Sequence, residues 1–291
     1  GVGGLIGFSY GGNIANSHAT GNVTAGNYSS GVGGLVGDSN YDAIDSVYAS
    51  GTVNGAVKVG GLIGSIYGSV VSQSAAWGDV SGTDNVGGLI GLSFSSLYTP
   101  SSSVSYSSAH GDVTGRDYVG GLVGGAYYSN ISNGYVNSPG ISATGGYVGG
   151  LVGIANVSSN VTNTYVNSNI TTTGTSYVGG LVGSMGTTGN INGGKLVDTY
   201  YTGNITISGT TPTNFGGLTG YMVPGTWISN SYYDIDNSKI NNAKVVTPGG
   251  IYTGQYTAWA NQGGASVMVT PSSRAALNID SYLTKDTDRK S

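Results

Sequence analysis

Cysteine and glutamate are both absent from this chain of 291 residues, which carries only 9 basic and 13 acidic side chains. Without cysteine the chain can form no disulfide, no thiolate metal site and no thiol nucleophile. The formal net charge of −4 is thinly spread, so no basic stripe is available for nucleic acid or an anionic membrane. No apolar run approaches the ~20 residues of a membrane-spanning helix. We therefore expect neither a nucleic-acid partner nor membrane insertion.

Straight-chain helix formers are also scarce, whereas glycine reaches 55 residues. Val, Ile, Thr, Tyr, Ser and Asn supply most of the remainder, and no window shows a sustained 3.6-residue apolar period. Glycine does not recur at every third position, which excludes collagen. The hydrophobic content of 38% and the low charge argue against a charge-driven disordered chain. The composition predicts an all-β protein.

An internal repeat organises most of the chain. The triplet Gly-Gly-Leu occurs eight times at intervals of 27 to 37 residues, usually after Val and before Ile or Val, and a further glycine follows each copy. The first glycines of the copies are Gly3, Gly33, Gly60, Gly87, Gly120, Gly149, Gly179 and Gly216. Repeats of this length are typical of structures built from stacked units.

The second half of each unit contains short polar strands around a glycine, as in segments 45–53 and 198–206. A unit of this size cannot bury its own apolar face, so successive coils must stack and share backbone hydrogen bonds. We predict an elongated β-solenoid, similar to a β-helix, with about eight coils of ~30 residues over residues 1–240. The extra residues of the longest unit, 210–213, should lie in a loop.

The motif Gly-Gly-Leu-(Ile/Val)-Gly at this period resembles the GLUG repeat of bacterial and archaeal surface and secreted proteins. The resemblance covers about residues 1–240, and Asn-Ser-Tyr-Tyr-Asp at 230–234 resembles the segment that closes such arrays. It implies an extracellular or cell-surface β-solenoid, but no single activity and no catalytic residue. Because residue 1 falls inside a repeat, we expect the chain to be a processed or partial piece of a longer protein.

The repeat pattern stops near residue 241, so segment 241–291 forms a second, non-repetitive region. One interpretation is a solenoid cap or interdomain linker, because an open sheet edge must be covered. The other is a strand or arm that docks on the next subunit. The notable side chains of this segment are Trp259, Met268, Pro271, Arg274, Lys285, Asp286, Asp288, Arg289 and Lys290.

Residues for nucleophilic catalysis are few. The two histidines, His18 and His110, differ in their offset from the repeat glycines, and no Gly-x-Ser-x-Gly elbow stands in a strand-to-helix context. Surface histidines in polar strands account for both. We therefore assign no catalytic residue.

Paired carboxylates offer a different chemistry, because glycoside-cleaving enzymes use two acids several ångströms apart. Asp38, Asp42 and Asp45 lie within eight residues, while Asp79 and Asp112 follow a glycine at the same place in neighbouring units. Turn-forming aspartate explains both groups without function. The first three could also hold a structural Ca²⁺ ion, although the Gly-Gly-x-Gly-x-Asp calcium repeat is absent. No other cofactor is expected.

Tyrosine is frequent, with 22 copies, and several recur at fixed places in the repeat. Stacked coils should align them into ladders, formed by Tyr118, Tyr147 and Tyr177 before Val-Gly-Gly and by Tyr135, Tyr165, Tyr200 and Tyr232 in the second strand. Three interpretations stay open: a sugar-binding face, a protein–protein interface, or strand aromatics that support their own ladder.

The leucine of each motif raises a question of direction. In a regular strand Val2 and Ile6 face one way and Leu5 the other, which would leave a stripe of leucine outside the core. If the glycine pair bends the chain, both sets enter the core. We favour the bend.

Seven Asn-x-Ser/Thr sequons are candidate glycosylation sites that would mark the exposed face of a secreted protein. They are Asn22, Asn27, Asn130, Asn156, Asn160, Asn169 and Asn204.

The leading hypothesis is a non-enzymatic structural protein of a microbial cell surface. Copies of a rigid, nearly uncharged solenoid would assemble with one another, or with other envelope components, into a sheath, filament or lattice such as an S-layer, with adhesion ranked close to assembly. The first alternative is a receptor-binding adhesin or fibre tip that recognises surface glycans through the tyrosine ladders. The second is a polysaccharide-active enzyme that uses Asp38, Asp42 and Asp45.

Overall fold

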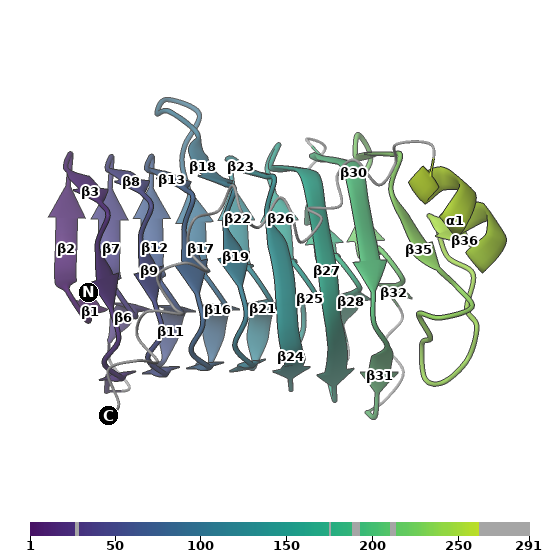
Figure 1. The fold of residues 1–291 in the computed structure, drawn as a ribbon. Helices are drawn as coiled ribbons and strands as arrows, with labels where there is room; N and C mark the ends of the chain where they lie inside the picture. Colours follow the sequence, from purple (N-terminus) through teal and green to yellow (C-terminus); the bar gives the residue numbers. More distant parts are fainter. Residues whose placement is uncertain (27–28, 175, 188–192, 210–213, 262–291) are drawn as a thin grey trace.

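The computed structural model describes residues 1–26, 29–174, 176–187, 193–209 and 214–261. These residues form a parallel β-solenoid of about seven turns. Figure 1 shows its coils stacked in a row from the purple N-terminal end to the yellow-green C-terminal end. The predicted all-β solenoid is therefore confirmed.

Two sheets of eight strands run along the solenoid, one before and one after each Gly-Gly-Leu motif. Sheet A contains β1 (Val2–Gly3), β6 (Ser30–Gly33), β11 (Val57–Gly60), β16 (Asp84–Gly87), β21 (Asp117–Gly120), β25 (Val148–Gly149), β28 (Tyr177–Gly179) and β32 (Asn214–Gly216). Sheet B contains β2 (Ile6–Tyr10), β7 (Val36–Asn40), β12 (Ile63–Tyr67), β17 (Ile90–Phe94), β22 (Val123–Tyr127), β26 (Val152–Asn156), β29 (Val182–Met185) and β33 (Thr219–Met222). The first glycine of each motif pairs with that of the next coil, as Gly33 does with Gly60. The eight motif copies thus occupy equivalent positions.

The polar half of each unit forms sheet C, which has twenty strands. They are β3 (Asn13–Ala15), β4 (His18–Ala19), β5 (Val23–Thr24), β8 (Ala43–Asp45), β9 (Tyr48–Ala49), β10 (Val53–Asn54), β13 (Val70–Ser72), β14 (Ala75–Ala76), β15 (Val80–Ser81), β18 (Ser102–Ser105), β19 (Ser108–Ala109), β20 (Val113–Gly115), β23 (Ser129–Ser132), β24 (Tyr135–Ala143), β27 (Asn160–Thr172), β30 (Lys195–Thr202), β31 (Ile205–Ile207), β34 (Trp227–Ser229), β35 (Tyr232–Asp234) and β36 (Gly250–Ile251). The first coils carry three short strands here, whereas later coils merge them into longer ones such as β27.

The glycine pair makes the corner between sheets A and B. A Cβ atom on Gly61 would lie 2.2 Å from the carbonyl oxygen of Gly88 in the next coil, so no side chain fits. This close approach lets the N–H groups of Leu62 and Ile63 both donate to the carbonyl oxygen of Leu89, at 2.9 and 3.0 Å. The glycine is required by the space between coils.

The leucine after this corner points into the core. Seven of the eight motif leucines are fully buried, whereas Leu5 in the first coil is 54% exposed. The buried ones are Leu35, Leu62, Leu89, Leu122, Leu151, Leu181 and Leu218. The favoured bend is therefore confirmed, and the valines on both sides of the corner join the leucines in one continuous core.

A short helix, α1 (Thr253–Asn261), follows the last strands at the C-terminal end (Figure 1). Its first residue donates from the Thr253 hydroxyl to Asp234 at 2.9 Å and from its N–H to Asp236 at 3.0 Å. Lys244 also donates to Asp236. The hydrogen bonds from Lys244 and Thr253 lower the pKa of Asp236 to about 2. These contacts hold α1 on the final coil.

The described part of the chain contains no helix long and apolar enough to cross a membrane. The predicted boundary near residue 240 stays a prediction, as does the choice between a cap and a docking arm. The expected loop at 210–213 and the tail from residue 262, with Met268, Pro271, Arg274, Lys285, Asp286, Asp288, Arg289 and Lys290, lie outside the described residues, as does the side chain of Trp259.

Candidate functional site

Tyr118, Tyr147 and Tyr177 line up along sheet A, as their register predicts. Both pairs of neighbouring rings have centroids 4.8 Å apart, and the ladder continues to Tyr221 at 5.0 Å. Partial burial raises the pKa of the Tyr118 and Tyr147 hydroxyls. The predicted alignment is confirmed, and the rings support one another along the rod.

In the second tyrosine ladder, on sheet C, the ring planes are closer to parallel than in the first. Tyr165 stacks on Tyr135 at 5.1 Å and on Tyr200 at 5.0 Å, with ring planes within 5° of parallel. Tyr232 pairs with Tyr200 in the strand register. Tyr135 and Tyr200 are buried, and burial raises the pKa of Tyr200. Because the faces of Tyr165 are covered by its neighbours, this ladder offers a ligand ring edges rather than open faces.

The stacking breaks at His110. The His110 ring meets Tyr135 edge-on, at 85° and 5.5 Å, and stacks on Trp77 at 3.8 Å. Trp77 and His110 stand two residues after the tyrosine column, whose place in these coils is taken by Ala75 and Ser108. Between the coil of His110 and the coil of Tyr135, the aromatic ring therefore shifts by two residues along the strand.

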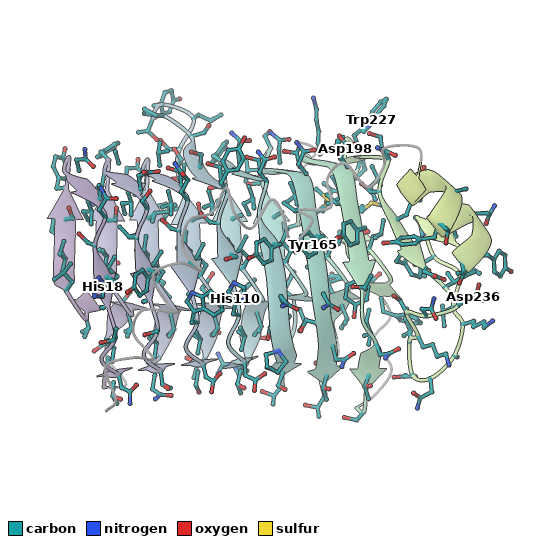
Figure 2. All side chains as sticks on the ribbon, in the orientation of Figure 1. His18, His110, Tyr165, Asp198, Trp227 and Asp236 are labelled. Carbon is teal, nitrogen blue, oxygen red and sulfur yellow. The ribbon has the colours of Figure 1, made fainter. Side chains whose placement is uncertain are left out.

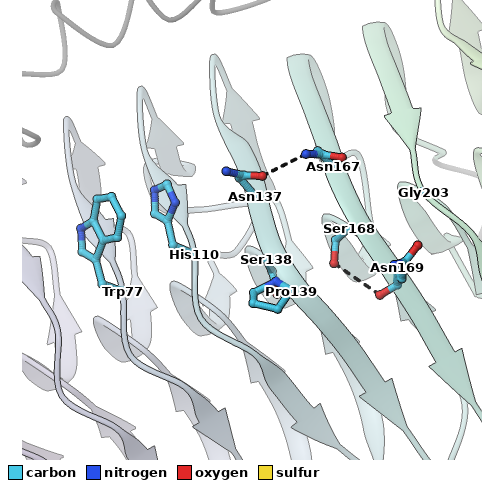
Figure 3. Close-up of a pocket in the computed structure, with 9 residues that line it drawn as sticks. All are labelled: Trp77, His110, Asn137, Ser138, Pro139, Asn167, Ser168, Asn169 and Gly203. Carbon is cyan, nitrogen blue, oxygen red and sulfur yellow. Dashed lines mark hydrogen bonds between the residues drawn. The ribbon is translucent and has the colours of Figure 1, made fainter.

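A hollow of about 520 Å³ opens at this step. Figure 3 shows Trp77 and His110 at one end, with the smaller Asn137 and Asn167 at the same register in the next two coils. Pro139 also lines the hollow. Figure 2 places His110 and Tyr165 near the middle of the rod, in full view on this side.

The polar groups of the hollow are side-chain amides, hydroxyls and the His110 imidazole. The Asn167 side-chain amide donates to the side-chain oxygen of Asn137 at 3.0 Å, and the side-chain oxygen of Asn169 accepts from the main-chain N–H of Asn204 at 2.9 Å. Ser138 and Ser168 are further lining residues, and no aspartate, lysine or arginine is among them. Arrangements that combine aromatic rings with a few polar groups suit small-molecule ligands.

The family model for the GLUG motif matches residues 1–24, which hold the first Gly-Gly-Leu copy and its polar half. The chain is a GLUG-motif β-solenoid. Each later Gly-Gly-Leu copy pairs in register with the copy before it, as Gly33 does with Gly3 and Gly60 with Gly33. Neither a curated protein nor a solved structure matches the chain.

The GLUG solenoid separates the three candidate calcium ligands. Asp42 is 2% exposed and accepts hydrogen bonds from the Ser39 hydroxyl at 2.7 Å and the Gly12 N–H at 2.6 Å. Asp38 lies in sheet B and Asp45 at the end of β8. Among the described residues no group of three His, Cys, Asp or Glu side chains is placed to hold a metal ion. The structure therefore gives the calcium hypothesis no support.

The carboxylate of Asp45 is likewise hydrogen-bonded by neighbouring side chains. It accepts hydrogen bonds from Ser72, Ser46 and Gln73, and the bond from Ser72 contributes most to lowering the pKa of Asp45. The Asp45 carboxylate is therefore engaged as a hydrogen-bond acceptor within the solenoid.

Asp79 and Asp112 belong to a column that links coils. The Asp79 carboxylate accepts from the N–H of Asp112 at 2.9 Å, and Asn22 and Asn204 make the equivalent bond to the next coil. Turn chemistry in the GLUG solenoid thus accounts for these acids.

The sequons differ in accessibility. Asn22, Asn130, Asn169 and Asn204 are exposed, and Asn160 is half-buried. Asn156 is 8% exposed and its amide donates to Thr187, so the folded chain has no room for a glycan there. Asn27 lies outside the described residues.

Sequence reasoning missed the hollow. It treated His110 alone and did not use Trp77. The detectable signal was their shared place before Gly-Asp-Val, at Gly78 and Gly111, which aligns the two rings in neighbouring coils. A further aromatic row also went unpredicted, with centroids 4.7 to 5.6 Å apart, formed by Tyr10, Tyr41, Tyr67 and Phe94.

Proposed function

We propose that this chain is a non-enzymatic structural protein of a microbial cell surface, acting as a rigid subunit of an extracellular sheath, filament or lattice. The observation that carries the proposal is the unbroken register of sheets A and B through all eight layers. Such a rod works by shape, and its partners are copies of itself or other envelope components.

The side chains between coils support this role. The buried Ser39 and Ser69 hydroxyls bond to each other at 3.0 Å, and the Asn160 amide bonds to Asn130 at 2.8 Å. Each coil is thus tied to the next by side chains as well as backbone. Among the basic side chains of the described residues, Arg116 and Lys244 pair with aspartate. With only 9 basic and 13 acidic side chains in 291 residues, the chain carries little charge to repel a neighbouring copy.

The acids proposed for a polysaccharide-active enzyme have structural partners. Asp42 is buried beneath Ser9 and Gly12, and Asp45 is bonded by three side chains. Glycoside cleavage needs two accessible carboxyl groups across one substrate bond, so the burial of Asp42 counts against a pair that includes it.

Antibody labelling of intact source cells tests the proposed location. The labelled epitope should be an exposed loop, such as the one around Leu97 and Tyr98, which are 74% and 95% exposed. Dense labelling of unbroken cells is the expected result. Labelling that requires permeabilised cells would contradict the proposal, and lysed cells serve as the positive control.

Adhesion is a second candidate role, favoured by one observation: the aromatic hollow at the break in the sheet C ladder, whose lining holds no aspartate, lysine or arginine.

A further inference from the structure

At the hollow beside Trp77 and His110, two large rings are followed along the rod by the smaller side chains of two asparagines. Trp77, His110, Asn137 and Asn167 occupy the same register in four successive coils. Gly203, in the coil after Asn167, also lines the hollow. The site therefore extends along the rod axis for roughly 19 Å, since neighbouring strands lie ~4.8 Å apart.

The aromatic end supplies an apolar wall. The Trp77 indole is larger than the His110 imidazole stacked on it, so the smaller ring cannot cover the whole indole face. Beyond His110 the next side chain in this column is the shorter Asn137, which leaves the step open. Aromatic walls of this kind pack against apolar faces of ligands, including the C–H face of a pyranose ring.

The floor supplies hydrogen-bond donors. The side-chain oxygen of Asn137 accepts from the Asn167 amide, and the side-chain oxygen of Asn169 accepts from the N–H of Asn204. The side-chain NH₂ groups of Asn137 and Asn169 have no partner in the described part of the chain. An amide presents two N–H donors, so each side chain can bond a ligand oxygen without losing its bond to the next coil. Both side chains are exposed.

The lining selects an uncharged ligand. None of the nine lining residues is an aspartate, lysine or arginine. A charged ligand would lose its hydration there without gaining an opposite charge, which is unfavourable. An elongated site with an aromatic wall, amide donors and no aspartate, lysine or arginine matches a neutral oligosaccharide.

We propose that this hollow binds a neutral oligosaccharide, extended along the solenoid axis. One sugar ring packs against Trp77 and His110, and the amides of Asn137 and Asn169 donate to hydroxyl groups of the following rings. The inference goes beyond the structural role and does not rest on it, because a rod can build a coat without binding any sugar.

The test is isothermal titration calorimetry of the full chain with neutral linear hexasaccharides of glucose, mannose, galactose and xylose, and with an acidic hexasaccharide of galacturonate. At least one neutral hexasaccharide should bind, and the galacturonate should not. Trp77→Ala should weaken binding at least about tenfold, as removal of a central aromatic anchor does. Asn137→Ala should weaken it severalfold through loss of the donor.

The matched control is Trp227→Ala. Trp227 is 64% exposed and lies at the upper edge of the rod in Figure 2, outside the lining of the hollow. Its loss should leave binding unchanged. Circular dichroism checks the fold of each variant, and the exposed Asn137 keeps the test valid if Trp77→Ala unfolds. The proposal is overturned if no neutral hexasaccharide binds at millimolar concentration, if only galacturonate binds, or if binding survives in folded Asn137→Ala and Trp77→Ala variants.

Discussion

Gly121→Ala, which adds a single methyl group, should destabilise the solenoid by at least about 3 kcal/mol. The new Cβ would lie 2.2 Å from the carbonyl oxygen of Gly150 in the next coil and 2.8 Å from a methyl group of Val136. The first contact is with backbone held by the sheet ladders, so the coils themselves would have to separate. The expected loss corresponds to a fall in melting temperature of about 6–12 °C, measured by circular dichroism.

Gly21→Ala is the matched control for this prediction. A Cβ atom on Gly21 would meet nothing within 4 Å, so the same chemical change should shift the melting temperature by less than about 2 °C. Equal shifts for the two variants would show that the coils are not packed as closely at the Gly-Gly-Leu corner as the structure has them.

The second large effect is expected for Asp42→Ala. The buried Asp42 carboxylate accepts from the hydroxyls of Ser9 and Ser39 and from the N–H of Gly12, and so joins the first two coils. Removing this acceptor leaves donors unpaired next to the core, at a cost of about 3 kcal/mol in the free energy of unfolding. Urea denaturation followed by circular dichroism measures that loss.

Two further variants show whether the acceptor itself matters. Asp42→Asn keeps one carbonyl oxygen and should fall between the wild type and Asp42→Ala. Asp112 is exposed and its carboxylate accepts no hydrogen bond from the described residues, so Asp112→Ala should change stability by no more than about 0.5 kcal/mol. If Asp42→Ala were as stable as Asp112→Ala, the structural assignment of Asp42 would be wrong.

The solenoid could be predicted from sequence because its strongest constraint is repeated eight times. Each motif glycine must face the backbone of the next coil, so copies such as Gly60 and Gly87 report the register directly. The sequence leaves two directions open for the Leu62 side chain, because strand alternation and a bent corner predict opposite faces. Only the corner geometry, with its shared acceptor at Leu89, decides it.

Helix α1 could not be predicted from its own residues. Segment 253–261 has few strong helix formers and no apolar period, so local sequence argues against a helix. Its start is instead held by distant contacts, through Thr253 to Asp234 and Asp236. Tertiary partners of this kind are invisible to pattern analysis.

The candidate site was only partly predictable. Identical residues in register, such as Tyr135 and Tyr165, make a ladder visible in the sequence, and the structure confirms it. The hollow arises where the residue type changes between coils, from Trp77 and His110 to Asn137. A search for repetition overlooks such a place, because its chemistry depends on the repeat being broken.

Electron microscopy of the protein, on its native cells and after purification, tests the assembly role. We expect the purified chain to form ordered tubes, sheets or filaments, and the same lattice to be visible on the cell surface. Isolated rods at high protein concentration, with no ordered layer on the cells, would contradict the assembly role.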